Sequence, residues 1–293
     1  MPDWLDLVIY FFGSGLAFFV GAGFVLVGVG ISPVAAGRAL QLTRNLFVLI
    51  GVLLVVISAA PLEWWLYAVL AIASCAWLPM EWLAEGRKVL VGRIVVAAAW
   101  LLAPVLELPY HFVPTLPAPG NPTLFVIGDS ISAGMSDVDK HTWPGIFARA
   151  HGIDVRDFSR MGATVGSARK QVQLIGDQNG LVLLEIGGND LLGTTSADQF
   201  EDRLEQLLAD VCQPGRTVVM LELPLPPLRN RFGMIQRRLA RQYEVILMPR
   251  RVLARVLTTT GATVDGIHLS AAGQELMANT MWEILRSGYG AAP

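Results

Sequence analysis

Four short blocks in the second half of the chain contain the residue types that ester hydrolysis by a serine nucleophile requires. They are Gly128-Asp129-Ser130, Gly162, Gly187-Gly188-Asn189-Asp190 and Asp265-Gly266-Ile267-His268. A serine hydroxyl can attack an acyl carbonyl, amide groups can stabilise the resulting oxyanion, and a carboxylate can orient an imidazole base. We therefore expect these blocks to meet in one active site.

The predicted nucleophile is Ser130, which follows an apolar stretch at residues 124–127. Such a stretch indicates a buried strand, and open α/β sheets place ligand-binding groups at the carboxyl ends of their strands. A helix that starts there also leaves backbone N–H groups free to receive negative charge. Gly-Asp-Ser alone would be an ordinary turn tripeptide, so the prediction depends on the other blocks.

The predicted base and its orienting carboxylate are His268 and Asp265, three residues apart before a predicted final helix at 271–286. A single histidine before a helix is more often a surface or capping residue. With a carboxylate at this spacing and a candidate nucleophile elsewhere, a catalytic triad becomes the better interpretation. We expect the Asn189 side chain and the N–H groups of Gly162 and Ser130 to form the oxyanion hole, with Asp129 and Asp190 as structural support.

The first half of the chain is apolar enough to cross a membrane. The whole sequence is 53% hydrophobic and 16% charged, and its mean hydropathy is +0.51. A run of roughly 20 apolar residues spans a hydrocarbon core of about 30 Å. Buried core helices are the alternative, but these stretches are apolar all round. We predict four transmembrane helices, at residues 7–37, 45–62, 64–80 and 89–106, with Arg93 in the fourth reaching toward the interface.

The positions of the basic residues predict the orientation of these helices. Arg38 and Arg44 lie in the first connection, Arg87, Lys88 and Arg93 lie around the third, and residues 1–6 contain no Lys or Arg. Cytoplasmic loops carry an excess of Lys and Arg, so both termini are expected on the extracytoplasmic side of a cell (inner) membrane. The first stretch is too long for a cleaved signal and is expected to remain in the mature protein.

The second half has the pattern of an α/β domain. Residues 109–122 are rich in proline, which favours an extended linker. Short apolar stretches then alternate with amphipathic ones, which indicates a parallel sheet with helices on both faces. We predict a four-helix membrane anchor at 1–108, a linker at 109–122 and a hydrolase domain at 123–293. The expected strands are residues 124–127, 155–158, 181–186, 218–223 and 245–248.

Together, residues 125–134, 161–164, 184–190 and 265–269 resemble the four blocks of the SGNH (GDSL) hydrolase superfamily, and Trp143-Pro144 is similar to its bacterial thioesterase and lysophospholipase branch. The resemblance implies a three-layer αβα fold, with Ser130, Asp265 and His268 as the catalytic residues and Ser130, Gly162 and Asn189 as the oxyanion donors. One departure is Ile131, where the family usually has leucine. Resemblance to this family does not identify the substrate, because its members cleave many esters and thioesters.

The resulting hypothesis is a membrane-anchored serine ester hydrolase that cleaves an acyl lipid or an acylated glycan. Alternatives are an O-acyltransferase or O-deacetylase acting on a cell-envelope glycan, and a non-catalytic acyl- or glycan-binding scaffold. No cofactor or metal is expected, and near-balanced charge argues against a nucleic-acid partner. Cys75 and Cys212 are expected to be buried free thiols, and the oligomeric state stays open. Eight arginines between 229 and 255 could bind anionic head groups, although a solvated helix face is favoured.

Overall fold

The computed structural model describes residues 4–32, 37–83, 85–118, 120–135 and 141–290. Within the chain there are two compact units: a helical unit of residues 11–111 with 225–230, and an α/β unit of residues 1–10, 112–224 and 231–293. Residues 33–36 of the first predicted transmembrane stretch, and Pro119 of the predicted linker, lie outside the described residues.

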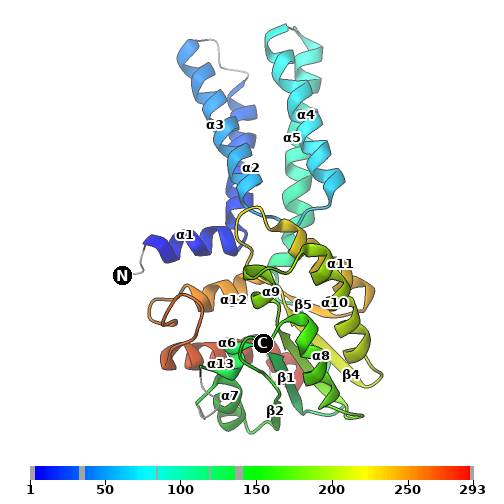
Figure 1. The fold of residues 1–293 in the computed structure, drawn as a ribbon. Coiled ribbons are helices and arrows are strands. Elements are labelled where there is room, and N and C mark those ends of the chain that lie inside the picture. The colour runs from blue at the N-terminus through cyan, green and yellow to red at the C-terminus, as the bar shows by residue number, and fades with distance from the viewer. Residues whose placement is uncertain (1–3, 33–36, 84, 119, 136–140, 291–293) are drawn as a thin grey trace. The chain divides into compact units, whose positions relative to one another are not determined.

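Four long helices form the helical unit, and three of them are long and apolar enough to cross a membrane, with α5 continuing into the 3-10 turn Leu108–His111. These elements are α2 (Leu16–Ile31), α3 (Arg38–Ile57), α4 (Trp64–Leu83) and α5 (Arg87–Glu107), preceded by α1 (Trp4–Gly13) (Figure 1).

The prediction of one continuous first helix over residues 7–37 is wrong. Helices α1 and α2 meet at an angle of 78° and are long and apolar enough to span a membrane only when taken together as a bent pair. The break falls at Gly13-Ser14-Gly15, where Gly15 has a φ of 90°. A left-handed backbone at this position interrupts a helix, and glycine adopts it without a steric penalty.

Glycines allow α2 and α3 to pack closely. A Cβ atom added to Gly21 would lie 2.7 Å from the Gly51 carbonyl oxygen, and one added to Gly51 would lie 2.6 Å from the Gly21 carbonyl oxygen. Small residues at such a crossing let two backbones approach closely. The resulting van der Waals contact favours helix association in surroundings that are as apolar as the helices themselves.

A buried ion cluster joins three helices of this unit. Both guanidinium nitrogens Nε and Nη2 of Arg93 donate to the Glu81 carboxylate, at 2.7 and 2.8 Å, and Arg44 Nη1 lies 3.5 Å from the same group. The Trp77 indole N–H also donates to Glu81, at 2.7 Å. Arg93, predicted to reach toward the interface, thus pairs with a carboxylate of α4, and its depth in a membrane stays a prediction.

The α/β unit contains five parallel strands in the order β2-β1-β3-β4-β5. They are β1 (Leu124–Gly128), β2 (Val155–Asp157), β3 (Gly180–Glu185), β4 (Arg216–Leu221) and β5 (Ile246–Met248). Every predicted strand is present, with ends shifted by one or two residues. The α/β fold class with a parallel sheet and preceding helices is confirmed.

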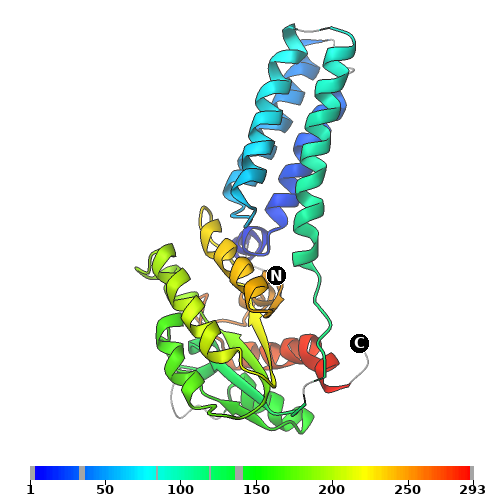
Figure 2. The ribbon, with the colours of Figure 1, turned by 90° about the vertical axis from the view of Figure 1, so that its right-hand side faces the viewer.

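Helices cover both faces of this sheet (Figures 1 and 2). On one face lie α7 (Trp143–His151), α12 (Arg250–Leu257) and α13 (Ala271–Leu285). On the other lie α8 (Val165–Gln173) and α10 (Ala197–Val211), with α11 (Asn230–Gln242) packed on α10 through Phe232 and Phe200, whose ring centroids are 4.9 Å apart. The result is the three-layer arrangement that the alternation of strands and helices predicts.

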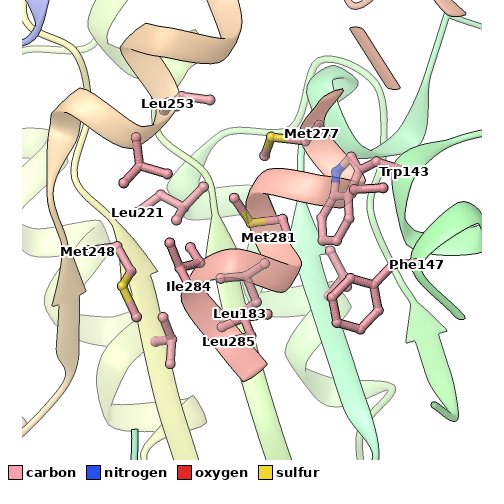
Figure 3. Packing of buried hydrophobic residues seen from close by; sticks show 14 of the residues in the cluster. Trp143, Phe147, Leu183, Leu221, Met248, Leu253, Met277, Met281, Ile284 and Leu285 are labelled. Carbon is pink, nitrogen blue, oxygen red and sulfur yellow. The ribbon is translucent and has the colours of Figure 1, made fainter. Parts of the chain in front are cut away.

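The core between the sheet and α13 is made of interdigitated apolar side chains. Met277, Met281 and Ile284 of α13 pack against strand residues such as Leu183 and Leu221 (Figure 3). The side chain of Ser270 accepts from Gly273 N at 3.1 Å and so caps this helix. Ser196 and Gln199 likewise form a capping box at the start of α10.

Two buried glutamine side chains fix the ends of strands. Gln171 of α8 accepts from Gly128 N and donates to Gly128 O, both at 3.0 Å. Gln236 of α11 accepts from Leu223 N at 3.0 Å and donates to Leu221 O at 3.3 Å. A side-chain amide contains a donor N–H and an acceptor oxygen. It can therefore form hydrogen bonds with backbone N–H and C=O groups that are not paired with a neighbouring strand. The end of β1, where the predicted nucleophile begins, is therefore held from the helix layer.

The loop before α13, which carries Asp265 and His268, is fixed by close backbone contact. Ser270 N donates to Ala262 O at 2.9 Å, and Thr263 pairs with Leu269 in an isolated antiparallel bridge. A Cβ atom added to Gly273 would lie 1.8 Å from the Ala262 carbonyl oxygen. Only glycine fits at this position without moving the loop.

Gly273→Ala should therefore lower both stability and ester turnover. Overpacking of this kind costs about 1–3 kcal/mol of unfolding free energy, and displacing the backbone of Ala262 also shifts the loop that carries His268. Thermal unfolding followed by circular dichroism, and turnover of a soluble ester, measure the two effects. Gly120→Ala is the control, because a Cβ atom there meets nothing within 4 Å. Equal behaviour of the two variants would contradict the prediction.

Candidate active site

Four of the predicted site residues, Asp129, Ser130, Asn189 and Asp190, lie at the carboxyl ends of β1 and β3. Ser130 begins the short helix α6 (Ser130–Ala133) directly after β1, and Asn189 lies in α9 (Gly188–Leu192) directly after β3. These two strands are neighbours in the sheet, and the chain runs outward from them in opposite directions. Such a switch point opens a crevice outside the strand ends, where α/β folds bind ligands.

The nucleophile turn is buried and leaves its amide unused. Ser130 is 6% exposed, and the preceding Asp129 caps α6 by accepting from Ile131 N at 3.0 Å. In the described part of the chain, the N–H groups of Ser130 and Gly162 donate to no other residue. Both are therefore available to an oxygen that enters the crevice.

The loop that carries Gly162 is attached to the nucleophile turn. Arg160 N donates to Gly128 O at 3.1 Å, and Gly162 itself has a φ of 70°. Asn189 Nδ2 donates to Ala163 O at 2.9 Å, and it lies 3.4 Å from Asp129 Oδ2. One hydrogen of the Asn189 amide therefore holds the loop through Ala163. The other makes only the longer contact with Asp129, so it is able to turn toward an oxyanion.

Asp265 and His268 form a close pair. His268 Nδ1 lies 2.6 Å from Asp265 Oδ2, and the N–H groups of Ile267 and His268 donate to Asp265 Oδ1 at 3.0 and 2.8 Å. The bond to His268, with these two backbone bonds, lowers the pKa of Asp265 to about 2. The carboxylate is thus ionised above that pH and fixes the imidazole with Nε2 as its free nitrogen.

His268 is brought to the nucleophile turn without a hydrogen bond to Ser130. No bond between the Ser130 hydroxyl and the imidazole exists among the described residues, but the charge of His268 lowers the pKa of neighbouring Asp129. Bonds between a nucleophile and its base are often long until substrate is bound. The imidazole is 31% exposed and is therefore accessible from solvent.

Three carboxyl groups beside the site have raised pKa values because they are buried. Burial raises the pKa of Asp129 to about 6, raises that of Glu185 well above its usual range, and raises that of Asp190. Asp190 Oδ2 accepts from Val165 N at 2.8 Å and so holds the start of α8 against α9. The role of Asp190 as structural support stays a prediction.

Sequence reasoning missed a buried polar chain below the nucleophile. Trp143 Nε1 donates to Ser132 Oγ at 3.0 Å, and Ser132 Oγ donates to Glu185 Oε2 at 2.8 Å. The signal was an acidic residue inside the apolar stretch Leu184-Glu185-Ile186. A charged residue inside a buried strand needs a buried hydrogen-bonding partner.

Metal-ligand groups and the two cysteines are further features of the sequence, and the structure bears on both. No group of three or more His, Cys, Asp or Glu in the described residues could hold a metal ion. Both cysteines are free, but Cys75 is exposed and Cys212 is only half-buried, so the expectation of two buried thiols is wrong. Burial raises the pKa of the Cys212 thiol to about 11.

The arginine-rich segment is occupied by ion pairs. Arg231, Arg238 and Arg255 pair with Asp198, Glu201 and Glu283, and buried Arg237 pairs with Glu222 at 2.6 Å. At least half of the eight arginines thus face carboxylates of this same chain, which weakens the interpretation of the segment as a head-group site.

Comparison with known proteins agrees with this arrangement. Residues 126–276 match the model of the GDSL-like Lipase/Acylhydrolase family. The chain is 31% identical over 186 residues to Thioesterase 1/protease 1/lysophospholipase L1 of Escherichia coli (strain K12), covering 60% of this chain and 89% of that protein. It is 29% identical over 187 residues to Arylesterase of Vibrio mimicus, covering 59% of this chain and 93% of that protein.

A solved structure shows the same fold. The psychrotrophic esterase EstA from Pseudoalteromonas sp. aligns with a TM-score of 0.53 at 18% identity, over 58% of this chain and 100% of its own. With a family model that covers half of the chain, a relative above 30% identity and this shared fold, the chain belongs to the GDSL-like lipase/acylhydrolase family, the SGNH hydrolases, and is a serine esterase or acylhydrolase.

Proposed function

We propose that Ser130 is the nucleophile that cleaves an acyl ester, with His268 as base and Asp265 as its orienting carboxylate. The observation that carries this proposal is the 2.6 Å contact between His268 Nδ1 and Asp265 Oδ2, together with the charge of His268 acting on Asp129 beside Ser130. A carboxylate on Nδ1 leaves Nε2 to take the hydroxyl proton and stabilises the imidazolium that forms.

The reaction proceeds through an acyl-enzyme. The Ser130 oxygen bonds to the acyl carbon while its proton passes to His268 Nε2. The N–H groups of Ser130 and Gly162 and the second Asn189 hydrogen then stabilise the oxyanion. The bond to the leaving alkoxide breaks as the alkoxide takes the proton from His268. Water, deprotonated by His268, releases the acid and restores Ser130.

The helical unit anchors this hydrolase in a membrane, with residues 1–108 as the anchor, 109–122 as the linker and 123–293 as the catalytic domain. Support comes from α3, α4 and the helix from Arg87 to His111, each long and apolar enough to span a bilayer. The basic residues at the first and third connections favour an extracytoplasmic catalytic domain.

The substrate is an acyl ester of a lipid or of an acylated envelope glycan. Support comes from the names of the relatives, which describe a thioesterase and lysophospholipase in E. coli and an arylesterase in V. mimicus. A catalytic domain tethered beside a bilayer meets both kinds of ester at the membrane surface.

Ser130→Ala should abolish hydrolysis and active-site labelling. Loss of a serine nucleophile typically lowers kcat about 10⁶-fold, and Asp265→Asn should lower it by about 10⁴-fold through the wrong imidazole tautomer. Turnover of p-nitrophenyl acetate and longer acyl esters, and labelling by a fluorophosphonate, measure this on the purified protein. Labelling that persists in Ser130→Ala would place the nucleophile elsewhere, and absence of turnover with every ester in the wild type would refute the hydrolase proposal.

Asp129→Asn should stabilise the protein more at pH 8 than at pH 4. The folded pKa of about 6 lies above the unfolded value of about 3.9. The favourable contribution of protonated Asp129 is therefore complete below about pH 4 and is lost as pH rises through 6. Asparagine removes the buried charge and keeps the cap, so the gain at pH 8 should be about 1–3 kcal/mol.

Urea unfolding of the wild type and variant at the two pH values measures this gain. The exposed carboxylate of Asp202 in α10 provides the control Asp202→Asn, for which no such pH-dependent gain is expected. A gain for Asp129→Asn that is equal at both pH values, or larger at pH 4, would contradict the assigned direction.

The proposed topology predicts the activity of reporter fusions. Alkaline phosphatase folds only outside the cytoplasm, so a fusion after Pro293 should be active and a fusion at Gly86, in the third connection, should be inactive. Phosphatase activity of whole cells, corrected for fusion abundance by immunoblot, is the measurement. The reverse pattern would place the catalytic domain in the cytoplasm.

A further inference from the structure

A cationic groove begins at the predicted oxyanion loop. Its volume is about 280 Å³, and it lies between the loop Arg160-Met161-Gly162-Ala163 and one face of α8. Ser167, Lys170 and Leu174 line the opposite wall at helical spacing. The groove therefore shares Gly162 with the proposed oxyanion hole.

The two charged residues of this groove are both positive. Its lining contains Arg160 and Lys170 and no carboxylate, and the Arg160 guanidinium donates to the carbonyl oxygen of Ser159 at 3.4 Å. The charge of Arg160 also acts on Asp157, whose pKa is raised by burial and partly lowered by hydrogen bonds from Ser159 and by this charge. Apolar Met161 and Leu174 lie beside the cations and are more than half exposed. A groove with these properties attracts an anion attached to an organic group.

Hydrogen bonds place this groove next to the reacting atoms. Arg160 N donates to the Gly128 carbonyl oxygen at 3.1 Å, two residues before Ser130. The other end of the loop is held by Asn189, which donates to Ala163 O at 2.9 Å. The backbone of Arg160 is thus held beside the nucleophile turn, and Arg160 itself lines the groove.

We propose that this groove binds an anionic group of the substrate, so that the enzyme prefers acyl esters carrying a phosphate, carboxylate or sulfate near the scissile bond. The inference rests on the proposed function and narrows its substrate class. The arginine-rich segment serves this purpose less well, because half of its arginines pair with carboxylates of the chain.

The test compares charged and neutral esters in the full chain. p-Nitrophenyl butyrate is the neutral substrate, p-nitrophenyl hemisuccinate puts a carboxylate on the acyl side, and 4-carboxyphenyl butyrate puts it on the alcohol side. Lauroyl glycerol phosphate against lauroyl glycerol separates a lipid head group from a small soluble anion. For each pair, the readout is the charged-to-neutral ratio of kcat/KM.

The double variant Arg160→Gln with Lys170→Gln should lower this ratio about three- to tenfold in at least one pair, chiefly through KM for the charged ester. The wild-type preference should weaken in 1 M salt, where the screening length falls from about 10 Å to about 3 Å. The exchange Arg160→Lys with Lys170→Arg should retain it. Arg169→Gln is the matched control, since Arg169 lies beside Lys170 but pairs with Asp210 at 2.6 Å.

An unchanged ratio in every pair, with neutral ester still hydrolysed, would overturn the inference and leave the hydrolase proposal standing. A reduced ratio in the soluble pairs alone would assign the groove to small acidic esters, and a reduced ratio in the lipid pair alone would assign it to phospholipid-type esters; both support an anionic subsite. Absence of turnover with all these esters in the wild type would overturn both proposals.

Discussion

The active site depends on the contact between the end of β1 and the end of β3. Asp129 N donates to Glu185 O at 3.2 Å, one residue beyond the last paired position of β1. This bond holds the turn that begins with Ser130 beside the loop that contains Asn189. Gln171 fixes Gly128 from the helix layer on one side, and Glu185 holds Ser132 from below. The proposed nucleophile and a proposed oxyanion donor are therefore positioned by strand pairing rather than by loop conformation.

Carboxyl groups around this contact fall into two electrostatic classes. Asp265 is half exposed, and three hydrogen bonds to it hold its pKa at about 2. Asp129, Glu185 and Asp190 are buried, and burial raises the pKa of each. Opposite environments of this kind move the pKa values of neighbouring carboxyl groups apart. The carboxyl group with the lowered pKa is the one that touches the imidazole.

Much of the α/β unit could be predicted from its sequence because local patterns determine it. Short apolar stretches gave all five strands, and Ser270 and Ser196 marked helix starts through their own side-chain bonds. The blocks around Ser130 and Asn189 could be assigned because strand ends converge at one edge of a parallel sheet. The block around Asp265 could be assigned because a carboxylate three residues from a histidine fits a catalytic triad. Their catalytic roles stay predictions, as does the division of the chain into anchor, linker and hydrolase.

Interactions between distant residues escaped prediction. The bend at Gly15 was missed because every residue around it is apolar or small, so hydropathy does not change there. The partner of Glu185 lies 53 positions away in Ser132, and the partner of Arg93 lies in another helix. Periodicity reports which face of an element is buried but does not report which polar group it meets.

The ion cluster of the helical unit limits how its helices can move. Apolar helix faces can slide along one another with little change in buried area. Arg44, Glu81 and Arg93 come from α3, α4 and α5, and the side chains of Arg44 and Glu81 are only 5% and 3% exposed. A slide of one turn, about 5.4 Å, would separate the charges and leave one uncompensated, at a cost of about 3–5 kcal/mol. The cluster thus sets the axial position of three helices, which their apolar surfaces alone leave undefined.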